Sequence, residues 1–244
     1  MTPVLMLIPG MTNTPRVWGR VRAHLQAEAR GAVEVRVTDV RASADIPAMA
    51  ATAWHELQDV PPERPLAVAG FSMGGYVALQ MLATAPRPAQ GLALVCTSAR
   101  PDNPAFASMR ERAIVVAQRD WERYTASVAS ALASPDAQAD RELMQAIQSD
   151  LREAGVDATV AQQRAVAQRA DQRPLLATLK LKALVIAGAL DPLIPPALSK
   201  EAADGIAGAR WREIEGVGHL LPWERPQALA AAMDEWLEGL RASA

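Results

Sequence analysis

A chain of 244 residues, half of them hydrophobic and 21% charged, is long enough for one large globular domain with a sizeable core. Its net charge of −2 gives no basic excess, which argues against a nucleic-acid partner. No apolar stretch approaches the roughly 18 residues of a membrane span, and the first residues lack the basic segment and cleavage site of a signal peptide. We therefore expect a cytoplasmic protein without a membrane partner.

Short apolar runs of strand length recur along the chain, at residues 4–8, 33–37, 66–69, 92–96, 183–187 and 210–214. Helical patterns lie between them, at about 17–29, 47–59, 74–85, 196–204 and 225–242. Most of the apolar runs are nearly continuous, which is typical of strands covered on both faces of a parallel sheet. The alternation of strand and helix predicts an α/β fold, a doubly wound sheet with helices on both faces.

One stretch interrupts this alternation. Residues 101–179 contain alanine-rich, charged helical patterns and no strand signal. We expect residues 1–100 and 180–244 to form the core, and residues 101–179 to form a helical lid over one edge of the sheet. Helices packed elsewhere on the surface are the alternative.

Chemically reactive side chains follow three of the predicted strands. Ser72 lies in the pattern Gly70-x-Ser72-x-Gly74, and Asp191 and His219 follow the fifth and sixth strands. Ligands of open α/β sheets bind at the carboxyl ends of the strands, so these side chains are expected at one edge. The glycine pattern is that of a nucleophile elbow, in which residues without a Cβ let strand and helix approach closely around a strained serine. A helix N-cap is the alternative for Ser72.

The order serine, acid, histidine predicts a catalytic triad. His219 would take the Ser72 proton and return it to the leaving group, while Asp191 would orient the imidazole. Asp102, after the fourth strand, is the alternative acid. His24 and His55 fall within helical patterns, on elements unsuited to catalysis, and are interpreted as solvated or half-buried.

Two backbone N–H groups are expected to hold the oxyanion. Met73 begins the helix after the nucleophile, where the helix dipole favours negative charge, and Met11 lies in the loop after the first strand.

Four segments of the sequence carry a resemblance to a known family. The segments "LIPGM...RVW", "GFSMGG", "LVIAGALDPLIPP" and "GVGHLLPWERPQAL" resemble, in this order, those of α/β-hydrolase-fold serine hydrolases, and the elbow and lid are similar to small bacterial carboxylesterases and enol-lactonases. Family members often begin with an antiparallel hairpin that this sequence lacks, so we expect six strands, mostly or all parallel. The oxyanion loop usually reads His-Gly and here reads Pro9-Gly10, which removes a side chain that braces the loop but keeps the backbone donor.

The resemblance implies hydrolysis of an ester, lactone or thioester of a small molecule through an acyl-enzyme on Ser72. The alternatives are C–C bond hydrolysis, cofactor-free peroxidation, or a small-molecule receptor without turnover. No cluster of metal-ligand spacing occurs, so neither a metal nor an organic cofactor is expected. The sequence does not distinguish a monomer from a homodimer.

Candidate substrate contacts are Arg100, Trp18 and Trp121, with Arg173 a further arginine that could hold a substrate carboxylate. Packing or a solvated surface position is the competing interpretation for each. The lone Cys96 lies in an apolar run and is interpreted as a buried structural thiol. Apolar residues at helical spacing in the lid are interpreted as its core, with a wall of the substrate pocket as the alternative: Phe106, Met109, Ile114, Trp121, Met144 and Ile147.

Overall fold

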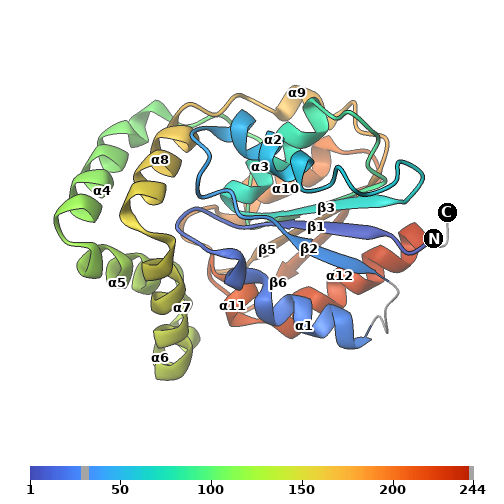
Figure 1. Cartoon of the computed structure of the whole chain (residues 1–244). Helices are drawn as coiled ribbons and strands as arrows, with labels where there is room; N and C mark the ends of the chain where they lie inside the picture. The colour runs from blue at the N-terminus through green and yellow to red at the C-terminus, as the bar shows by residue number, and fades with distance from the viewer. Residues whose placement is uncertain (29–32, 242–244) are drawn as a thin grey trace.

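The computed structural model describes residues 1–28 and 33–241 and contains one six-stranded sheet (Figure 1). The strand order is β2-β1-β3-β4-β5-β6, and all five neighbouring pairs are parallel. The strands are β1 (Val4–Ile8), β2 (Glu34–Val37), β3 (Leu66–Phe71), β4 (Gly91–Val95), β5 (Lys182–Gly188) and β6 (Arg210–Ile214). The predicted six-stranded parallel sheet is confirmed.

Burial along the strands follows their place in the sheet. Strands β1, β3 and β4 are buried at every residue, because helices cover both faces of the sheet centre. The two edge strands are less buried: β2 has one buried residue, Val35, and β6 has none.

Helices cover both faces of the sheet, as Figure 1 shows. On one face the core contains residues of α1 (Gly19–Glu28) and α12 (Pro226–Arg241). On the other it contains residues of α2 (Ile46–His55), α3 (Met73–Ala83) and α10 (Pro196–Gly205). Successive residues of β1 point alternately into these two cores, which is the period-two pattern of a strand.

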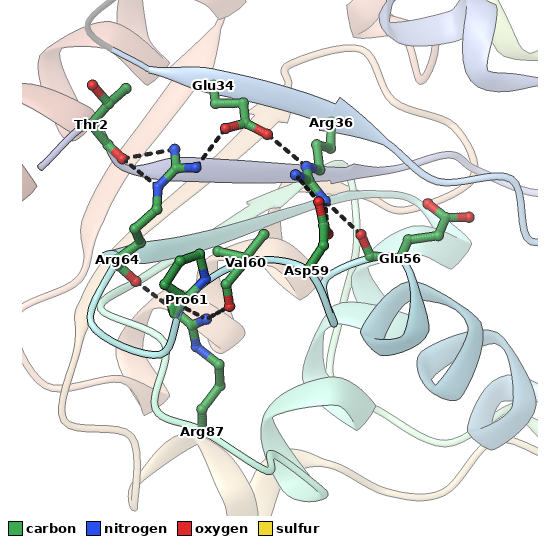
Figure 2. A network of polar contacts seen from close by, with 9 residues as sticks. All are labelled: Thr2, Glu34, Arg36, Glu56, Asp59, Val60, Pro61, Arg64 and Arg87. Carbon is green, nitrogen blue, oxygen red and sulfur yellow. Dashed lines mark hydrogen bonds and ion pairs between the residues drawn. The ribbon is translucent and has the colours of Figure 1, made fainter.

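Ion pairs secure the edge strand β2. Glu34 accepts hydrogen bonds from Arg64 and Arg36, both at 2.7 Å, and these two bonds lower the pKa of its carboxyl. Arg36 also forms a bidentate ion pair with Asp59, in which its two terminal nitrogens donate to the two carboxylate oxygens at 2.5 and 2.9 Å (Figure 2). Arg87 donates to backbone carbonyls in the same network and joins it to the loop before β4. Charged side chains on an exposed edge strand also oppose pairing with other chains.

A group of helices interrupts the core between β4 and β5. It contains the short 3-10 helix η2 (Pro104–Phe106), α4 (Ala107–Arg119), α5 (Trp121–Leu132), α6 (Pro135–Ala139), α7 (Arg141–Ala154), α8 (Val156–Ala167) and α9 (Arg173–Leu176). We call α4–α8 the inserted helices. In Figure 1 they gather beyond the end of the sheet opposite to the chain's N-terminus, which is the end where the parallel strands finish.

Element boundaries differ from expectation by a few residues. The helix expected at 17–29 begins at Gly19, because a 3-10 turn, η1 (Pro15–Trp18), precedes it. The helix expected at 47–59 ends at His55, and a short helix, α11 (Leu221–Glu224), precedes α12. Positions 29 and 242, where two of the expected helices end, lie outside the described residues. Within the described part, no helix has both the length and the apolar character needed to cross a bilayer.

Candidate active site

Ser72 lies in a sharp turn between β3 and α3, in a backbone conformation that few side chains adopt. Its φ and ψ are 52° and −117°, and a non-glycine residue there carries strain on the order of 1–3 kcal/mol. The Ser72 side chain makes no capping hydrogen bond to helix α3, in contrast to an ordinary N-cap serine. The turn therefore leaves the hydroxyl available to another partner.

Close backbone contacts fix this turn. A Cβ atom on Gly70 would lie 2.1 Å from the carbonyl oxygen of Gly74, and one on Gly74 would lie 2.3 Å from the carbonyl oxygen of Ile8. Only glycine lets β3, α3 and the end of β1 approach this closely. The Thr97 hydroxyl, just after β4, donates to the Ser72 carbonyl at 2.8 Å and supports the turn.

The His219 imidazole joins the Ser72 hydroxyl to the Asp191 carboxylate. Nε2 lies 2.9 Å from Oγ of Ser72, and Nδ1 lies 2.7 Å from Oδ2 of Asp191. The other Asp191 oxygen accepts the N–H groups of Leu193 and Ile194 at 2.9 and 2.8 Å, so both oxygens are held in place. His219 and Asp191 are buried, while Ser72 is partly exposed. Such an arrangement allows Nε2 to take a proton from Oγ while Nδ1–H stays bonded to the carboxylate.

Asp102, the alternative acid, binds two arginines instead of the histidine. Its carboxylate accepts hydrogen bonds from Arg110 at 2.6 Å and from Arg169 at 2.9 Å. Burial raises the pKa of Asp102, but these hydrogen bonds and charges outweigh it, so the pKa lies below its ordinary value. The other two histidines lie on helices of the core: His24 is half-buried within α1, and His55 is exposed at the end of α2.

The two candidate oxyanion donors lie on segments that meet beside Ser72. Met73 is the first residue of α3, where an N–H group has no partner within the helix. Met11 lies in the turn after β1, and the close approach of Gly74 to the carbonyls of Ile8 and Pro9 brings this turn against the start of α3. The helix dipole adds partial positive charge at the same place.

Sequence reasoning missed a buried carboxylate beside His219. Glu224 is 5% exposed, and its oxygens accept the N–H groups of Gly218, Leu220 and Ser134 at 3.1, 3.2 and 3.2 Å. The first two flank His219, and the third follows the inserted helix α5. Glu224 therefore holds the histidine loop and the inserted segment together. An acidic residue among the apolar and aromatic residues of "HLLPWE" was the available signal.

A second buried carboxylate was also missed. Asp150 of α7 is 0% exposed, and it accepts hydrogen bonds from Asn13 and Thr14, in the loop that contains Met11. Asp150 falls on the same helical face as the buried Leu143 and Ile147. A charged residue on an apolar helix face is a signal that the sequence carried.

The candidate substrate contacts are occupied by other partners. Arg100 forms an ion pair with Glu201 at 2.7 Å, and Arg173 forms one with Asp171 at 2.5 Å, and both pairs are partly exposed. Trp18 is fully buried and packs edge-on against Phe71, and the Phe71 ring in turn lies 5.3 Å from the ring of His219. The position of Trp18 is thus one of packing beneath the site. Trp121 is partly buried and stacks on Tyr124 within α5.

Two apolar residues expected in the core of the inserted helices are exposed: Phe106 by 46% and Met109 by 44%. They lie on η2 and at the start of α4, whose first turns carry no buried residue, whereas Ile114 and Ile147 are buried as expected.

Cys96 is fully buried at the end of β4, and burial raises the pKa of its thiol well above the usual value. Such a thiol is protonated and unreactive at neutral pH. Among residues 1–28 and 33–241, no group of three or more histidine, cysteine or acidic side chains could hold a metal ion.

A cavity of about 350 Å³ lies beside α1 and α11, and none of Ser72, Asp191 and His219 lines it. Its walls carry both positive and negative charges, including Arg20, Arg225, Asp136 and Asp140. The geometry of the three hydrogen-bonded side chains, and not the size of this cavity, therefore locates the candidate active site.

Comparison with known sequences agrees with this geometry. A profile described as "Alpha/beta hydrolase family" matches residues 5–232, which includes all three side chains. Among relatives, the chain is similar to a pimeloyl-[acyl-carrier protein] methyl ester esterase of Neisseria meningitidis. The two are 25% identical over 187 residues, which cover 73% of this chain and 72% of the relative.

Solved structures share the whole architecture. A thermophilic esterase from Thermogutta terrifontis, determined with malate bound, matches with a TM-score of 0.86 and 25% identity, over 97% of this chain and 90% of that chain. An enol-lactonase from Burkholderia xenovorans LB400 matches with a TM-score of 0.81 and 23% identity, over 98% of this chain and 92% of that chain. At that identity the second likeness concerns the fold alone.

Proposed function

The chain belongs to the alpha/beta hydrolase family, and from this premise we propose that it is a serine hydrolase that cleaves an ester-type bond of a small molecule through an acyl-enzyme on Ser72. The bond would be a carboxylic ester, a lactone or a thioester. One observation carries this proposal: an unbroken line of hydrogen bonds runs from Asp191 through His219 to a serine held in a strained turn.

In the first half of the reaction, Oγ of Ser72 attacks the substrate carbonyl carbon while Nε2 of His219 takes the hydroxyl proton. Asp191 keeps the proton of the imidazole on Nδ1 and stabilises the imidazolium that forms. The carbonyl oxygen becomes an oxyanion, which the N–H groups of Met11 and Met73 would bind. When the tetrahedral intermediate collapses, His219 gives the proton to the departing alcohol or thiol, and the acyl group stays on Oγ.

In the second half, water replaces the leaving group. His219 takes a proton from the water as it attacks the acyl carbon, and the same two N–H groups hold the second oxyanion. Collapse of this intermediate breaks the bond between the acyl carbon and Oγ. The proton returns from His219 to Ser72, and the carboxylic acid leaves.

We assign residues 101–179 the role of a lid that shapes the substrate pocket. The N–H of His219 donates to the carbonyl of Leu132, at the end of α5, at 2.8 Å, so the insertion touches the catalytic loop directly. A cytoplasmic location stays a prediction from the sequence, and both a monomer and a homodimer are compatible with the proposed function.

Hydrolysis of p-nitrophenyl esters from acetyl to palmitoyl, by wild type and by Ser72→Ala, tests the proposal. Turnover of short chains that disappears in Ser72→Ala supports it. Labelling of the wild type by a fluorophosphonate probe, lost in the same variant, supports Ser72 as the nucleophile even if none of these esters fits the pocket. Absence of both turnover and labelling would leave the non-catalytic receptor.

A further inference from the structure

The loop that carries Met11 is held from outside the core, by two of the inserted helices. The Thr12 N–H donates to Oε1 of Gln162 at 2.8 Å, and the Thr12 hydroxyl lies 3.3 Å from that of Thr159. Both partners belong to α8. Thr12 has a φ of 59°, a conformation that threonine adopts only when its surroundings impose it.

The strongest restraint on this loop is Asp150 of α7. Its Oδ1 accepts the Thr14 hydroxyl at 2.5 Å and the Thr14 N–H at 3.3 Å, and its Oδ2 accepts the Asn13 side-chain amide at 3.1 Å. All three donors come from the loop after β1. The carboxylate is 0% exposed, and burial raises the pKa of Asp150. A carboxylate buried at such a cost is expected to do more than fill space.

Gln162 gives a second indication that the inserted helices hold this loop. Its Nε2 is buried without a hydrogen-bond partner in the described part of the chain, so only its oxygen, on the Thr12 amide, is used. A leucine would fill the same volume without a buried, unsatisfied donor. The contact with the Thr12 amide is therefore what distinguishes glutamine from an apolar residue here.

These contacts restrain the segment that carries the Met11 amide. Met11 lies between Gly10, whose missing side chain leaves the backbone free to rotate, and Thr12, whose amide is held by Gln162. Pro9, the residue before Gly10, offers no side-chain donor that could brace the loop from within. The Gly10–Met11 peptide plane, which carries the Met11 N–H, meets the anchored Met11–Thr12 plane at the Cα of Met11. Holding Thr12 and Thr14 therefore restricts the backbone rotations that turn the Met11 N–H.

We propose that Asp150 is a positioning residue of the oxyanion hole, and that helix α7, through Asp150, aims the Met11 N–H at the reacting carbonyl. This inference rests on the proposed function of Ser72 and Met11. It gives the insertion a second role, because the insertion then completes the electrostatic part of the site as well as covering it.

Asp150→Ala is the disruptive variant, and Asp150→Asn is the conservative one. Alanine removes every acceptor from the three loop donors. Asparagine keeps one oxygen for Thr14, and its amide can donate to the Asn13 side chain once that amide turns over. Glu153→Gln is the matched control, because Glu153 lies on the same helix and pairs with Arg16, just after the loop, but both side chains are half exposed.

The measurements are kcat and KM for p-nitrophenyl acetate, the rate of labelling by a fluorophosphonate, the ester chain-length profile, and thermal unfolding. The phosphonyl oxygen occupies the oxyanion hole, so labelling reports on the hole separately from turnover. In Asp150→Ala we expect kcat and the labelling rate to fall together by about 10- to 100-fold, with little change in KM. Asp150→Asn should recover most of both rates, and Glu153→Gln should behave as wild type.

A merely structural role gives a different pattern. If Asp150→Ala shifts KM or the chain-length preference and leaves kcat and the labelling rate unchanged, Asp150 only attaches the insertion, and the inference is wrong. If Asp150→Ala does not fold, Thr14→Val removes one donor to the same carboxylate, and the same fall in both rates is expected. Failure of wild type both to hydrolyse the esters and to react with the probe would overturn the proposed function together with this inference, whereas a reactive wild type with an equally reactive Asp150→Ala overturns the inference alone.

Discussion

A Cβ atom on Gly188 would lie 2.2 Å from the carbonyl oxygen of Gly218, so the strand that leads to Asp191 and the loop that carries His219 touch through their backbones. The contact is backbone to backbone and cannot be relieved by rotating a side chain. The backbone contact therefore sets the distance between the segments that carry Asp191 and His219, independently of their side-chain conformations.

Gly188→Ala is therefore expected to push the histidine loop away from β5. We expect a loss of about 1–3 kcal/mol in the free energy of unfolding and a lower kcat, since the hydrogen bond between Asp191 and His219 must lengthen. Urea unfolding and ester kinetics measure both effects. Gly19→Ala is the control: a Cβ there meets nothing within 4 Å, so no loss is expected. Equal effects of the two substitutions would contradict this account.

The proposed triad of Ser72, His219 and Asp191 should act as one unit. Ser72→Ala or His219→Ala alone is expected to lower kcat on the order of 10⁶-fold, and the double variant no further, because each single change already disables proton transfer to and from Oγ. Asp191→Asn should lower kcat about 10⁴-fold, since it favours the wrong tautomer of the imidazole. Single-turnover kinetics and circular dichroism of the variants provide the check. A double variant much slower than either single one would refute the shared role.

The pair of arginines around Asp102 makes stability depend on pH. The pKa of Asp102 is below its ordinary value of 3.8 in the folded state, so the ionised carboxylate contributes stability above that pH, and this is lost as the pH falls through the folded-state pKa. We expect Asp102→Asn to lower the free energy of unfolding by about 2 kcal/mol at neutral pH, because it leaves Arg110 and Arg169 without their carboxylate.

Urea unfolding of wild type and Asp102→Asn between pH 7 and about 2.5 tests this prediction, and the two curves should converge at the acid end. The exposed pair of Asp171 and Arg173 supplies a control, Asp171→Asn, for which little change at neutral pH is expected. A stability difference that stays constant with pH would show that the Asp102 carboxylate is not the group responsible.

Glu224→Gln should weaken both the fold and the catalysis. Its three partners are all N–H donors, so the amide group of glutamine would face one of them without an acceptor. We expect a loss of about 1–3 kcal/mol in stability and a fall in kcat, because Gly218 and Leu220 flank His219. Thermal unfolding and kcat are to be compared with those of Glu235→Gln, an exposed partner of Arg212. Unchanged kcat would mean that the loop holds His219 without Glu224.

The sequence was sufficient to predict the sheet, its parallel pairing and the three residues that meet at its edge. Continuous apolar runs report strands buried on both faces, and the carboxyl ends of parallel strands meet at one edge, so Ser72, Asp191 and His219 could be placed together. Boundaries were less accurate: η1 begins the segment expected as one helix, because Pro15 and the Thr14 cap favour a tight first turn.

The contacts of the inserted helices could not be predicted in the same way. Their order in space is set by side-chain packing between α5, α7 and α8 and the loops of the core, and helical periodicity alone does not say which face meets which loop. Asp150, Gln162 and Glu224 accept hydrogen bonds from backbone N–H groups that lie 90 to 150 residues away in the chain. Every residue except proline carries such a donor, so the sequence does not indicate which one a buried side chain will bind. Arg100 shows the converse, since a cation at a strand end found an acidic partner on α10.

The position of the insertion also has a consequence for synthesis on the ribosome. Gly91 of β4 pairs with Lys182 of β5, and everything between β4 and β5 must be translated before that pairing can form. At about 5–20 residues per second, the edge of β4, which is apolar and buried in the finished protein, remains open for a time on the order of 10 s. During this interval the nascent chain holds an incomplete sheet with a vacant hydrogen-bonding edge, which makes β4 the segment where aggregation or chaperone capture is expected to begin.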